Sequence, residues 1–356
     1  MKILTVVGAR PQFIKASVIS RALRKKGVQE VIVHTGQHHD AEMSQVFFRE
    51  LEIPEPDYNL GINDLPNPVM TAGMIEKIHG VLEKEKPDSV LVYGDTNSTL
   101  AGAVAAKQNN YSLSHVEAGL RSFNMHMSEE INRILTDRIS DNLFCPTPTA
   151  MNNLRQEGFE NFKCRMLLTG DVMYDAALFY NNLSETKSTI LKKLLLKDFV
   201  LVTLHRSENV DNTETLTRLV SSLNEINKKI QVVLPLHPRT KKRLEESGIK
   251  FSFETIKPVS YLDMIQLLKN CRLVMTDSGG LQKEAFFFQK HCITLREQTE
   301  WTELVRHGFN VLAGSSKEKI MKTFDTMMSK TSDFRINLYG SGNAGDIIVD
   351  ELMSGK

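Results

Sequence analysis

Three acidic residues, Asp95, Glu117 and Glu130, are the strongest candidates for proton-transfer chemistry in this 356-residue chain. Asp95 and Glu117 each follow a short β-type apolar run, and Glu130 stands at the start of a helical pattern. Carboxylates that converge on one cleft repel one another, which raises at least one pKa and suits general acid and base catalysis. The residue pattern therefore predicts an acid–base cluster in the first half of the chain.

Each carboxylate also has a structural alternative. Asp95 lies at a strand-to-helix junction in a run of Asp, Thr, Asn and Ser, which are all good helix caps. Glu129 and Glu130 could form a solvated first turn that complements the helix dipole. Glu117 is harder to explain without a function, because a carboxylate at a strand end is costly to bury.

The second half contains a turn suited to a nucleotide diphosphate. The chain reads Thr-Asp-Ser-Gly-Gly-Leu-Gln-Lys-Glu-Ala over residues 276–285, after a predicted strand. Ser278, Gly279 and Gly280 let the backbone approach a ligand, and the N-terminus of the following helix favours an anion. Glu284, one turn further, could reach ribose hydroxyls.

Three basic residues after other predicted strands could assist the same anion. His205 and His237 each lie close to an arginine, which suits a phosphate or a developing oxyanion. Arg10 follows Gly8 at the first strand-to-helix turn and offers a bidentate donor. The alternative for each is a plain connecting turn.

A parallel sheet in each half of the chain would position these residues. β-type runs alternate with helical patterns, which is typical of an α/β fold whose ligands bind at the carboxyl ends of the strands. The expected strands are 3–7, 30–34, 89–92, 112–116 and 143–145, then 199–203, 231–234, 273–276 and 292–295. The clearest expected helices are 12–26, 70–85, 129–140 and 343–353. We therefore predict two Rossmann-like domains, 1–170 and 171–341, with the active site in the cleft between them.

The composition is that of an ordinary globular protein. Lys and Arg number 44 against 43 Asp and Glu, which gives no global electrostatic case for binding nucleic acid or an anionic membrane. The four cysteines form no CxxC pair and are expected to be buried thiols rather than disulfides or zinc ligands. No apolar run reaches about 18 residues, and residues 1–8 read as a strand and turn rather than a signal peptide. We expect a soluble cytoplasmic protein.

At these residues the sequence resembles the non-hydrolysing UDP-N-acetylglucosamine 2-epimerase family. The matching segments are 8–15, 35–38, 94–96, 115–121, 129–133, 205–209, 235–238, 277–285 and 299–300, in order along essentially the whole chain. The resemblance implies a glycosyltransferase-B-type fold, a homodimer, and a C-terminal helix, about 342–356, that packs back on the first domain. It implies neither a cofactor nor a metal.

The family inverts C2 of a UDP-linked 2-acetamido sugar. A base takes the C2 proton as UDP leaves C1, and UDP then adds back to the 2-acetamidoglucal while a proton reaches the opposite face of C2. By resemblance the catalytic residues are Asp95, Glu117, Glu130 and His205. The diphosphate would be held by Arg10, His237, Ser278, Gly279 and Gly280, the ribose by Glu284, and Lys15 is a further substrate-binding candidate.

Three departures indicate a particular branch. Residues 8–12 read Gly-Ala-Arg-Pro-Gln where Gly-Thr-Arg-Pro-Glu is common, residues 121–129 are shorter than usual, and Trp301 follows Thr299 and Glu300 where Arg-Pro is commoner. Together they look like the branch that converts UDP-2,3-diacetamido-2,3-dideoxy-glucuronate to its mannuronate epimer for surface polysaccharide, such as lipopolysaccharide O-antigen. Arg121 or His126 could pair with the sugar carboxylate.

Other predictions and rivals remain. The apparently extra residues His39-Asp40 argue against the second, activating sugar-nucleotide site that some family members have. UDP-N-acetylglucosamine is the alternative substrate. A glycosyltransferase, a hydrolysing epimerase and a catalytically silent nucleotide-sugar sensor are the rival functions.

Overall fold

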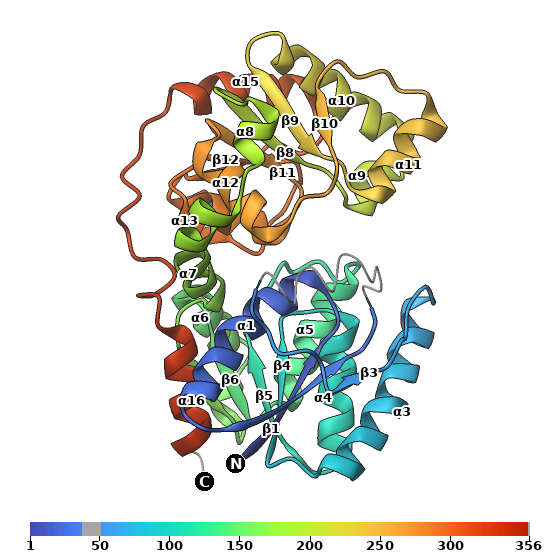
Figure 1. Cartoon of the computed structure of the whole chain (residues 1–356), viewed down its shortest axis with the longest axis vertical. Coiled ribbons are helices and arrows are strands. Elements are labelled where there is room, and N and C mark those ends of the chain that lie inside the picture. Colours follow the sequence, from blue (N-terminus) through green and yellow to red (C-terminus); the bar gives the residue numbers. More distant parts are fainter. Residues whose placement is uncertain (38–50, 355–356) are drawn as a thin grey trace. The chain divides into compact units, whose positions relative to one another are not determined.

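The computed structural model describes residues 1–37 and 51–354 of the chain (Figure 1). The chain divides into two compact units. Unit 1 comprises Met1–Leu178 and Asn337–Lys356, and unit 2 comprises Phe179–Ile336. The division falls inside helix α7 (Val172–Lys187). Residue His38 of the motif at 35–38, and the pair His39-Asp40, lie outside the described residues.

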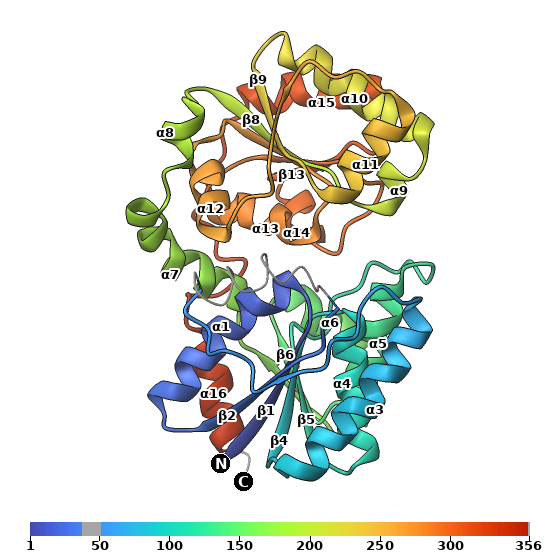
Figure 2. The same ribbon diagram turned by 45° about the vertical axis from the view of Figure 1, so that its right-hand side comes forward.

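Among the described residues, unit 1 contains a 7-stranded parallel sheet in the order β3-β2-β1-β4-β5-β6-β7. Its strands are β1 (Lys2–Val7), β2 (Gln29–His34), β3 (Tyr58–Asn59), β4 (Ser89–Tyr93), β5 (Ser112–Val116), β6 (Asn142–Cys145) and β7 (Arg165–Leu168). The helices between them are α1 (Arg10–Lys25), α3 (Asn67–Glu85), α4 (Asn97–Gln108), α5 (Ser128–Ile139) and α6 (Pro148–Gln156), with a short 3₁₀ turn at Phe159–Asn161. Strands β1, β4 and β5 are almost wholly buried, as expected when helices cover both faces of a parallel sheet (Figure 2).

Unit 2 repeats this architecture in its described residues, with a 6-stranded parallel sheet in the order β10-β9-β8-β11-β12-β13. Its strands are β8 (Phe199–Thr203), β9 (Gln231–Pro235), β10 (Glu254–Ile256), β11 (Leu273–Thr276), β12 (Cys292–Thr294) and β13 (Asn310–Leu312). Its helices are α8 (Ile190–Leu194), α9 (Ser207–Val210), α10 (Thr213–Asn227), α11 (Pro238–Ser247), α12 (Tyr261–Asn270), α13 (Gly279–Phe287), α14 (Thr302–Arg306) and α15 (Lys317–Ser329). In both sheets the first three strands are added toward one side and the following strands toward the other side of the first strand. This strand order is that of dinucleotide-binding folds. The predicted α/β class with two Rossmann-like sheets is confirmed.

All the predicted strands are present, and the strands that were not predicted are the outermost strands of each sheet. β3 and β7 close the first sheet, and β10 and β13 close the second. Each is two to four residues long, and their residues are mostly half-buried or exposed. An edge strand covered on fewer sides lacks the continuous apolar run that identifies a central parallel strand.

The four cysteines are free thiols, as predicted. Three are buried, whereas Cys164 is only half-buried, which corrects the expectation for that residue. Burial raises the pKa of the Cys271 thiol to about 12, so this thiol is unreactive. In the described part of the chain, no helix has both the length and the apolar character needed to cross a bilayer.

The last helix, α16 (Ala344–Ser354), belongs to unit 1 and packs along α1 (Figures 1 and 2). The Gly345 N–H in its first turn donates to Asp175 Oδ2 over 2.8 Å. Asp175 is 9% exposed, and this burial raises its pKa to about 6, although the hydrogen bond from the Gly345 N–H acts to lower the pKa. The docking of α16 therefore depends on a carboxyl group that is costly to ionise.

We predict that Asp175→Asn stabilises the protein above pH 6. The unfolded-state pKa of Asp is about 3.9, so the wild type loses stability as pH rises from about 4 to 6, whereas Asn keeps the acceptor without ionising. The expected gain at pH 7.5 is of the order of 2 kcal/mol in the free energy of unfolding, vanishing at pH 4. Urea denaturation at both pH values measures it, with the exposed Asp350→Asn as control. Destabilisation of Asp175→Asn at pH 7.5 would contradict the prediction.

Candidate functional site

Asp95 and Glu117 both lie at the carboxyl-terminal end of the unit 1 sheet. Their strands β4 and β5 are hydrogen-bonded neighbours, with Tyr93 opposite Val116 at the carboxyl end. Glu117 adopts φ 73°, a left-handed conformation that non-glycine residues rarely adopt. Such strained residues concentrate at functional sites, where the surroundings hold them in place.

Lys15 of α1 forms a buried ion pair with Glu117. The ammonium group donates to Oε1, and the two residues are 6% and 9% exposed. Gly94 has φ 65°, which favours glycine, and a Cβ there would make a tight contact of 3.0 Å with Lys15 Nζ. Lys15, predicted as a substrate-binding residue, is thus a direct partner of a predicted catalytic carboxylate.

Arg133 connects the other two carboxylates. One guanidinium nitrogen donates to Asp95 Oδ2, and another donates to Glu130 Oε2 over 2.8 Å. Asn132, the preceding residue of α5, donates to the Asp95 main-chain carbonyl over 3.0 Å. Asp95 and Glu130 are therefore brought together through a shared cation, which offsets the mutual repulsion expected of them.

Glu130 is fully buried and occupied by its own chain. Its carboxylate accepts the N–H groups of Ser122 and Phe123 at 2.8–3.1 Å and the Ser122 hydroxyl at 2.9 Å. The alternative of a solvated first turn is therefore wrong for Glu130. The contacts show that it fixes the loop after Leu120, whereas Asp95 keeps a side chain that is 31% exposed.

The helix-cap alternative for Asp95 is also wrong, because the next residue is the cap. The Thr96 hydroxyl accepts the Thr99 N–H, and the Thr99 hydroxyl accepts the Thr96 N–H in return. This reciprocal pair caps α4. Asp95 is left to its contacts with α5.

The first turn differs from the anion site predicted there. The buried Gln12 side chain accepts the Gly8 and Ala9 N–H groups at 2.8 and 3.0 Å. Those two amides are therefore already used by the protein itself. The contact of Arg10, the first residue of α1, with a diphosphate stays a prediction.

The predicted pairing of Arg121 with a sugar carboxylate is contradicted by its partners. Arg121 is 2% exposed and forms a bidentate ion pair with Glu157 at 2.7 and 2.8 Å. It also donates to Asp137 Oδ2 and to the Leu120 carbonyl, each over 2.7 Å. Because its donors serve these acceptors, Arg121 supports the fold behind the site.

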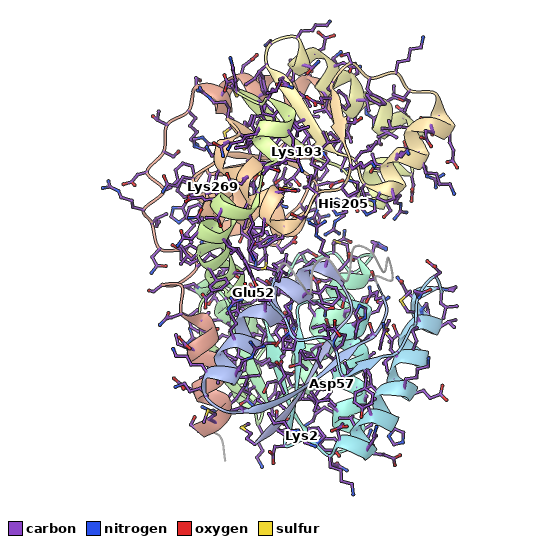
Figure 3. The ribbon with its side chains drawn as sticks, viewed as in Figure 1. Lys2, Glu52, Asp57, Lys193, His205 and Lys269 are labelled. Carbon is purple, nitrogen blue, oxygen red and sulfur yellow. The ribbon has the colours of Figure 1, made fainter. Side chains whose placement is uncertain are left out.

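In unit 2, a buried carboxylate holds the loop that carries His205. Asp277, at the end of β11, accepts the His205 and Arg206 N–H groups at 3.0 and 2.9 Å, and His205 Nδ1 lies 3.1 Å from its Oδ1. Burial alone would raise the pKa of Asp277, but His205 and these amides hold it below its usual value. The His205 side chain, labelled in Figure 3, is 37% exposed.

His205 and His237 are brought together at this end of the unit 2 sheet. Their ring centroids are 5.6 Å apart. His237 is the N-cap of α11, and its Nδ1 accepts the Arg239 N–H over 3.2 Å. Nδ1 of each ring faces its own loop, so the other ring nitrogen, Nε2, is the one suited to a phosphate.

The turn at Ser278, Gly279 and Gly280 leads into α13 without a side-chain cap. A Cβ on Gly279 would lie 2.2 Å from Glu300 Oε1, so a larger residue there would have to displace the Glu300 carboxylate. A Cβ on Gly280 would meet no atom within 4 Å, so that face of the backbone is open to a ligand. Glu284, predicted for the ribose, lies on α13 one turn beyond Gly280.

Buried polar side chains hold the turn at 278–280 in place through hydrogen bonds. Gln282 donates to the Ser278 carbonyl over 3.2 Å, and its Oε1 accepts from the Thr299 hydroxyl and the Asn310 amide. Arg296 pairs with Glu300 over 3.2 Å. The loop after β12, which contains Thr299 and Glu300, is therefore tied to the predicted diphosphate site.

Several residues that shape the site were not singled out from the sequence: Arg133, His115, Asp137, Asp277 and Gln282. Arg133 lies one helical turn after Glu130, a spacing that could have indicated an ion pair. Asp277 immediately precedes Ser278 and could have been expected to orient a neighbouring loop. No sequence signal connects Asp137 with His115, 22 residues away.

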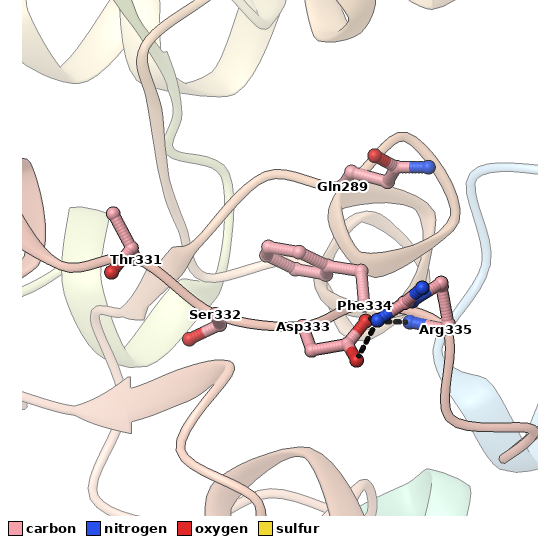
Figure 4. A pocket seen from close by; sticks show the side chains of 6 residues that line it. All are labelled: Gln289, Thr331, Ser332, Asp333, Phe334 and Arg335. Carbon is pink, nitrogen blue, oxygen red and sulfur yellow. Dashed lines mark hydrogen bonds and ion pairs between the residues drawn. The ribbon is translucent and has the colours of Figure 1, made fainter.

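The surface cavity in Figure 4 lies elsewhere. It has a volume of about 460 Å³ and is lined by Gln289 and residues 331–335 of unit 2. Its charged groups, Asp333 and Arg335, pair with each other at 2.8 Å. None of the predicted site residues lines it.

We predict that Arg121→Met destabilises the fold. The substitution leaves Glu157 without its cation and Asp137 without one of its two partners. Removing one partner of a buried ion pair costs about 3–5 kcal/mol. Urea denaturation measures the loss, with Arg155→Met as control, because Arg155 forms an exposed pair with Glu160. Equal stability of the two variants would restore Arg121 as a candidate for ligand binding.

Comparison with known proteins places this arrangement in a family. The sequence model described as UDP-N-acetylglucosamine 2-epimerase matches residues 21–353. A UDP-2,3-diacetamido-2,3-dideoxy-D-glucuronate 2-epimerase from Pseudomonas aeruginosa is 53% identical, with 99% of each chain covered. The UDP-N-acetylglucosamine 2-epimerase of Methanocaldococcus jannaschii is 43% identical over the full length of both chains.

Solved structures agree. The crystal structure of the Methanocaldococcus jannaschii UDP-GlcNAc 2-epimerase in complex with UDP-GlcNAc and UDP superimposes with a TM-score of 0.94 at 42% identity, covering 100% of both chains. The Neisseria meningitidis UDP-GlcNAc 2-epimerase bound to UDP-GlcNAc gives a TM-score of 0.88 at 32% identity, again over 100% of both chains. The resemblance of the motifs is confirmed, and the chain belongs to the UDP-N-acetylglucosamine 2-epimerase family.

Proposed function

We propose that the protein is a non-hydrolysing UDP-sugar 2-epimerase that acts on UDP-2,3-diacetamido-2,3-dideoxy-D-glucuronate. The observation that carries the proposal is the placement of Asp95 and Glu117 at the carboxyl-terminal end of one sheet, each with a cationic partner. Full-length similarity to the Pseudomonas aeruginosa enzyme supports this substrate. UDP-N-acetylglucosamine is the second candidate, because the relatives from Methanocaldococcus jannaschii and Neisseria meningitidis carry that name.

The reaction proceeds by elimination and re-addition. A carboxylate of unit 1 removes the C2 proton, the C1–O bond breaks, and its electron pair leaves with the diphosphate. The products of this step are UDP and a 2-acetamidoglucal. UDP then adds back to C1 while a second group protonates C2 from the opposite face, which inverts that centre.

Unit 2 supplies the groups for the departing diphosphate. The open backbone at Gly280 and the N-terminus of α13 offer N–H donors to an anion. His205 and His237 supply ring donors, and Arg10 of unit 1 adds a guanidinium. Donors that are already in place stabilise the developing charge without reorganisation in the transition state.

Glu130 acts differently from the other two carboxylates in this proposal. Its oxygens hold Ser122, Phe123 and Arg133, so it positions Asp95 through the shared arginine. Asp95 and Glu117 are the proton-transfer groups. With Arg121 occupied elsewhere, His126 in the same loop is the remaining candidate for the sugar carboxylate, and unchanged uronate preference in His126→Gln would exclude it.

We also propose a cytoplasmic homodimer that supplies a mannuronate for surface polysaccharide such as O-antigen. Family resemblance supports these points. Exposed apolar side chains on α5 and the loop before it, which include Phe123, Met125 and Leu135, are consistent with a surface between two copies. The particle mass in solution tests the dimer.

Incubation with each UDP-sugar in D₂O, followed by proton NMR, tests the reaction. The proposal predicts a new C2 epimer, deuterium at C2 and UDP still attached to the sugar. The uronate should give a higher kcat/KM than UDP-N-acetylglucosamine. Sugar transfer to an acceptor indicates a glycosyltransferase, free sugar a hydrolysing epimerase, and binding without exchange a sensor. Any of these three results would overturn the proposal.

A further inference from the structure

We propose that His115 is a positioning residue that clamps together the two backbone segments carrying Asp95 and Glu117. The proposal rests on the function proposed above, since it assigns those carboxylates to proton transfer. His115 does not itself contact the substrate in this account. It acts through a line of buried hydrogen bonds within unit 1.

The His115 ring lies between two acceptors. Its Nε2 is 2.7 Å from the Gly94 carbonyl, and its Nδ1 is 2.7 Å from Asp137 Oδ1. The side chains of His115 and Asp137 are both 0% exposed. Water therefore cannot replace either bond, and each polar group depends on its partner.

Both ring nitrogens have to donate. A main-chain carbonyl can only accept, so Nε2 carries a proton toward Gly94. The Asp137 carboxylate accepts two further N–H contacts on Oδ2, one from the Gly119 main chain and one from the Arg121 guanidinium, so it is an acceptor for Nδ1 as well. Although burial works to raise the pKa of Asp137, His115 and Arg121 hold it below its usual value.

The bonds of this clamp end on the two catalytic segments. Gly94 immediately precedes Asp95, so the bond from Nε2 fixes the start of that turn. Gly119, two residues after Glu117, donates its N–H to Asp137 Oδ2 over 3.1 Å. His115 itself lies on β5 two residues before Glu117. The segment around Glu117 is thus held on both sides and joined to the segment of Asp95.

The clamp also explains how a non-glycine residue keeps a left-handed backbone at position 117. Strained conformations persist only where the surroundings determine them fully. Behind the ring, the charges alternate through Asp137, Arg121 and Glu157. This alternation leaves the array without an uncompensated charge when the ring carries both protons.

Two neutral variants separate the two bonds. In His115→Asn the side-chain amide can reach the Nδ1 position and donate to Asp137, but it cannot reach Gly94. In His115→Gln the longer amide can reach the Nε2 position and donate to Gly94. The matched control is His79→Gln, an exposed histidine of α3. UDP affinity, measured by calorimetry, reports whether each variant is folded and binds nucleotide.

The proposal predicts that kcat for C2 deuterium exchange falls about 10²-fold in His115→Asn, as expected for misplaced reacting groups. KM and UDP affinity should change much less, His115→Gln should recover part of the loss, and His79→Gln should match the wild type. Wild-type kcat in a folded His115→Asn would overturn the proposal. A loss of UDP affinity equal to the loss of kcat would overturn it as well.

A spectroscopic measurement decides the clamp independently of activity and of variant stability. In wild-type protein labelled with ¹⁵N-histidine, both ring nitrogens of His115 should show a directly bonded proton, and His115→Gln assigns the signals by their loss. A single protonated ring nitrogen would overturn the proposal. If the wild type exchanges no C2 hydrogen, the proposed function fails, while this spectrum still decides the hydrogen-bond pattern.

Discussion

Carboxylates that follow neighbouring parallel strands lie together at the carboxyl-terminal end of the sheet, where their mutual repulsion has to be offset. This constraint explains most of the polar structure in unit 1. Lys15 balances Glu117, and Arg133 balances Asp95 and Glu130. Each cation comes from the helix that is the next element after a strand. The connectivity of the parallel sheet therefore places both cations near the carboxyl ends of the strands.

Unit 2 meets the opposite requirement, because it has to receive an anion. There the buried carboxylate Asp277 is satisfied by loop N–H groups and by His205, and it is not aimed at a ligand. The open backbone at Gly280 and the uncapped start of α13 supply the donors instead. One fold thus carries two chemistries, and the difference lies in the turns that follow the strands.

The sequence predicted the central strands and the residues at their ends, because continuous apolar runs and turn residues are local signals. It missed the short edge strands, such as β3 and β13, for lack of such runs. It offered Arg121 or His126 for the sugar carboxylate because both lie in the altered segment 121–129 and carry the right chemistry for an anion. The actual partners of Arg121, Asp137 and Glu157, lie 16 and 36 residues away, and only the folded chain brings them to it. The same holds for His115, whose partners no spacing rule connects.

The most direct measurement of the central claim is C2 hydrogen exchange in D₂O from each purified epimer, with Asp95→Asn and Glu117→Gln. If the two carboxylates act on opposite faces of C2, each variant should still exchange one epimer but not the other, and the two variants should differ in which one they exchange. Neither variant should interconvert the epimers at an appreciable rate. Exchange of both epimers at the wild-type rate in either variant would contradict the account.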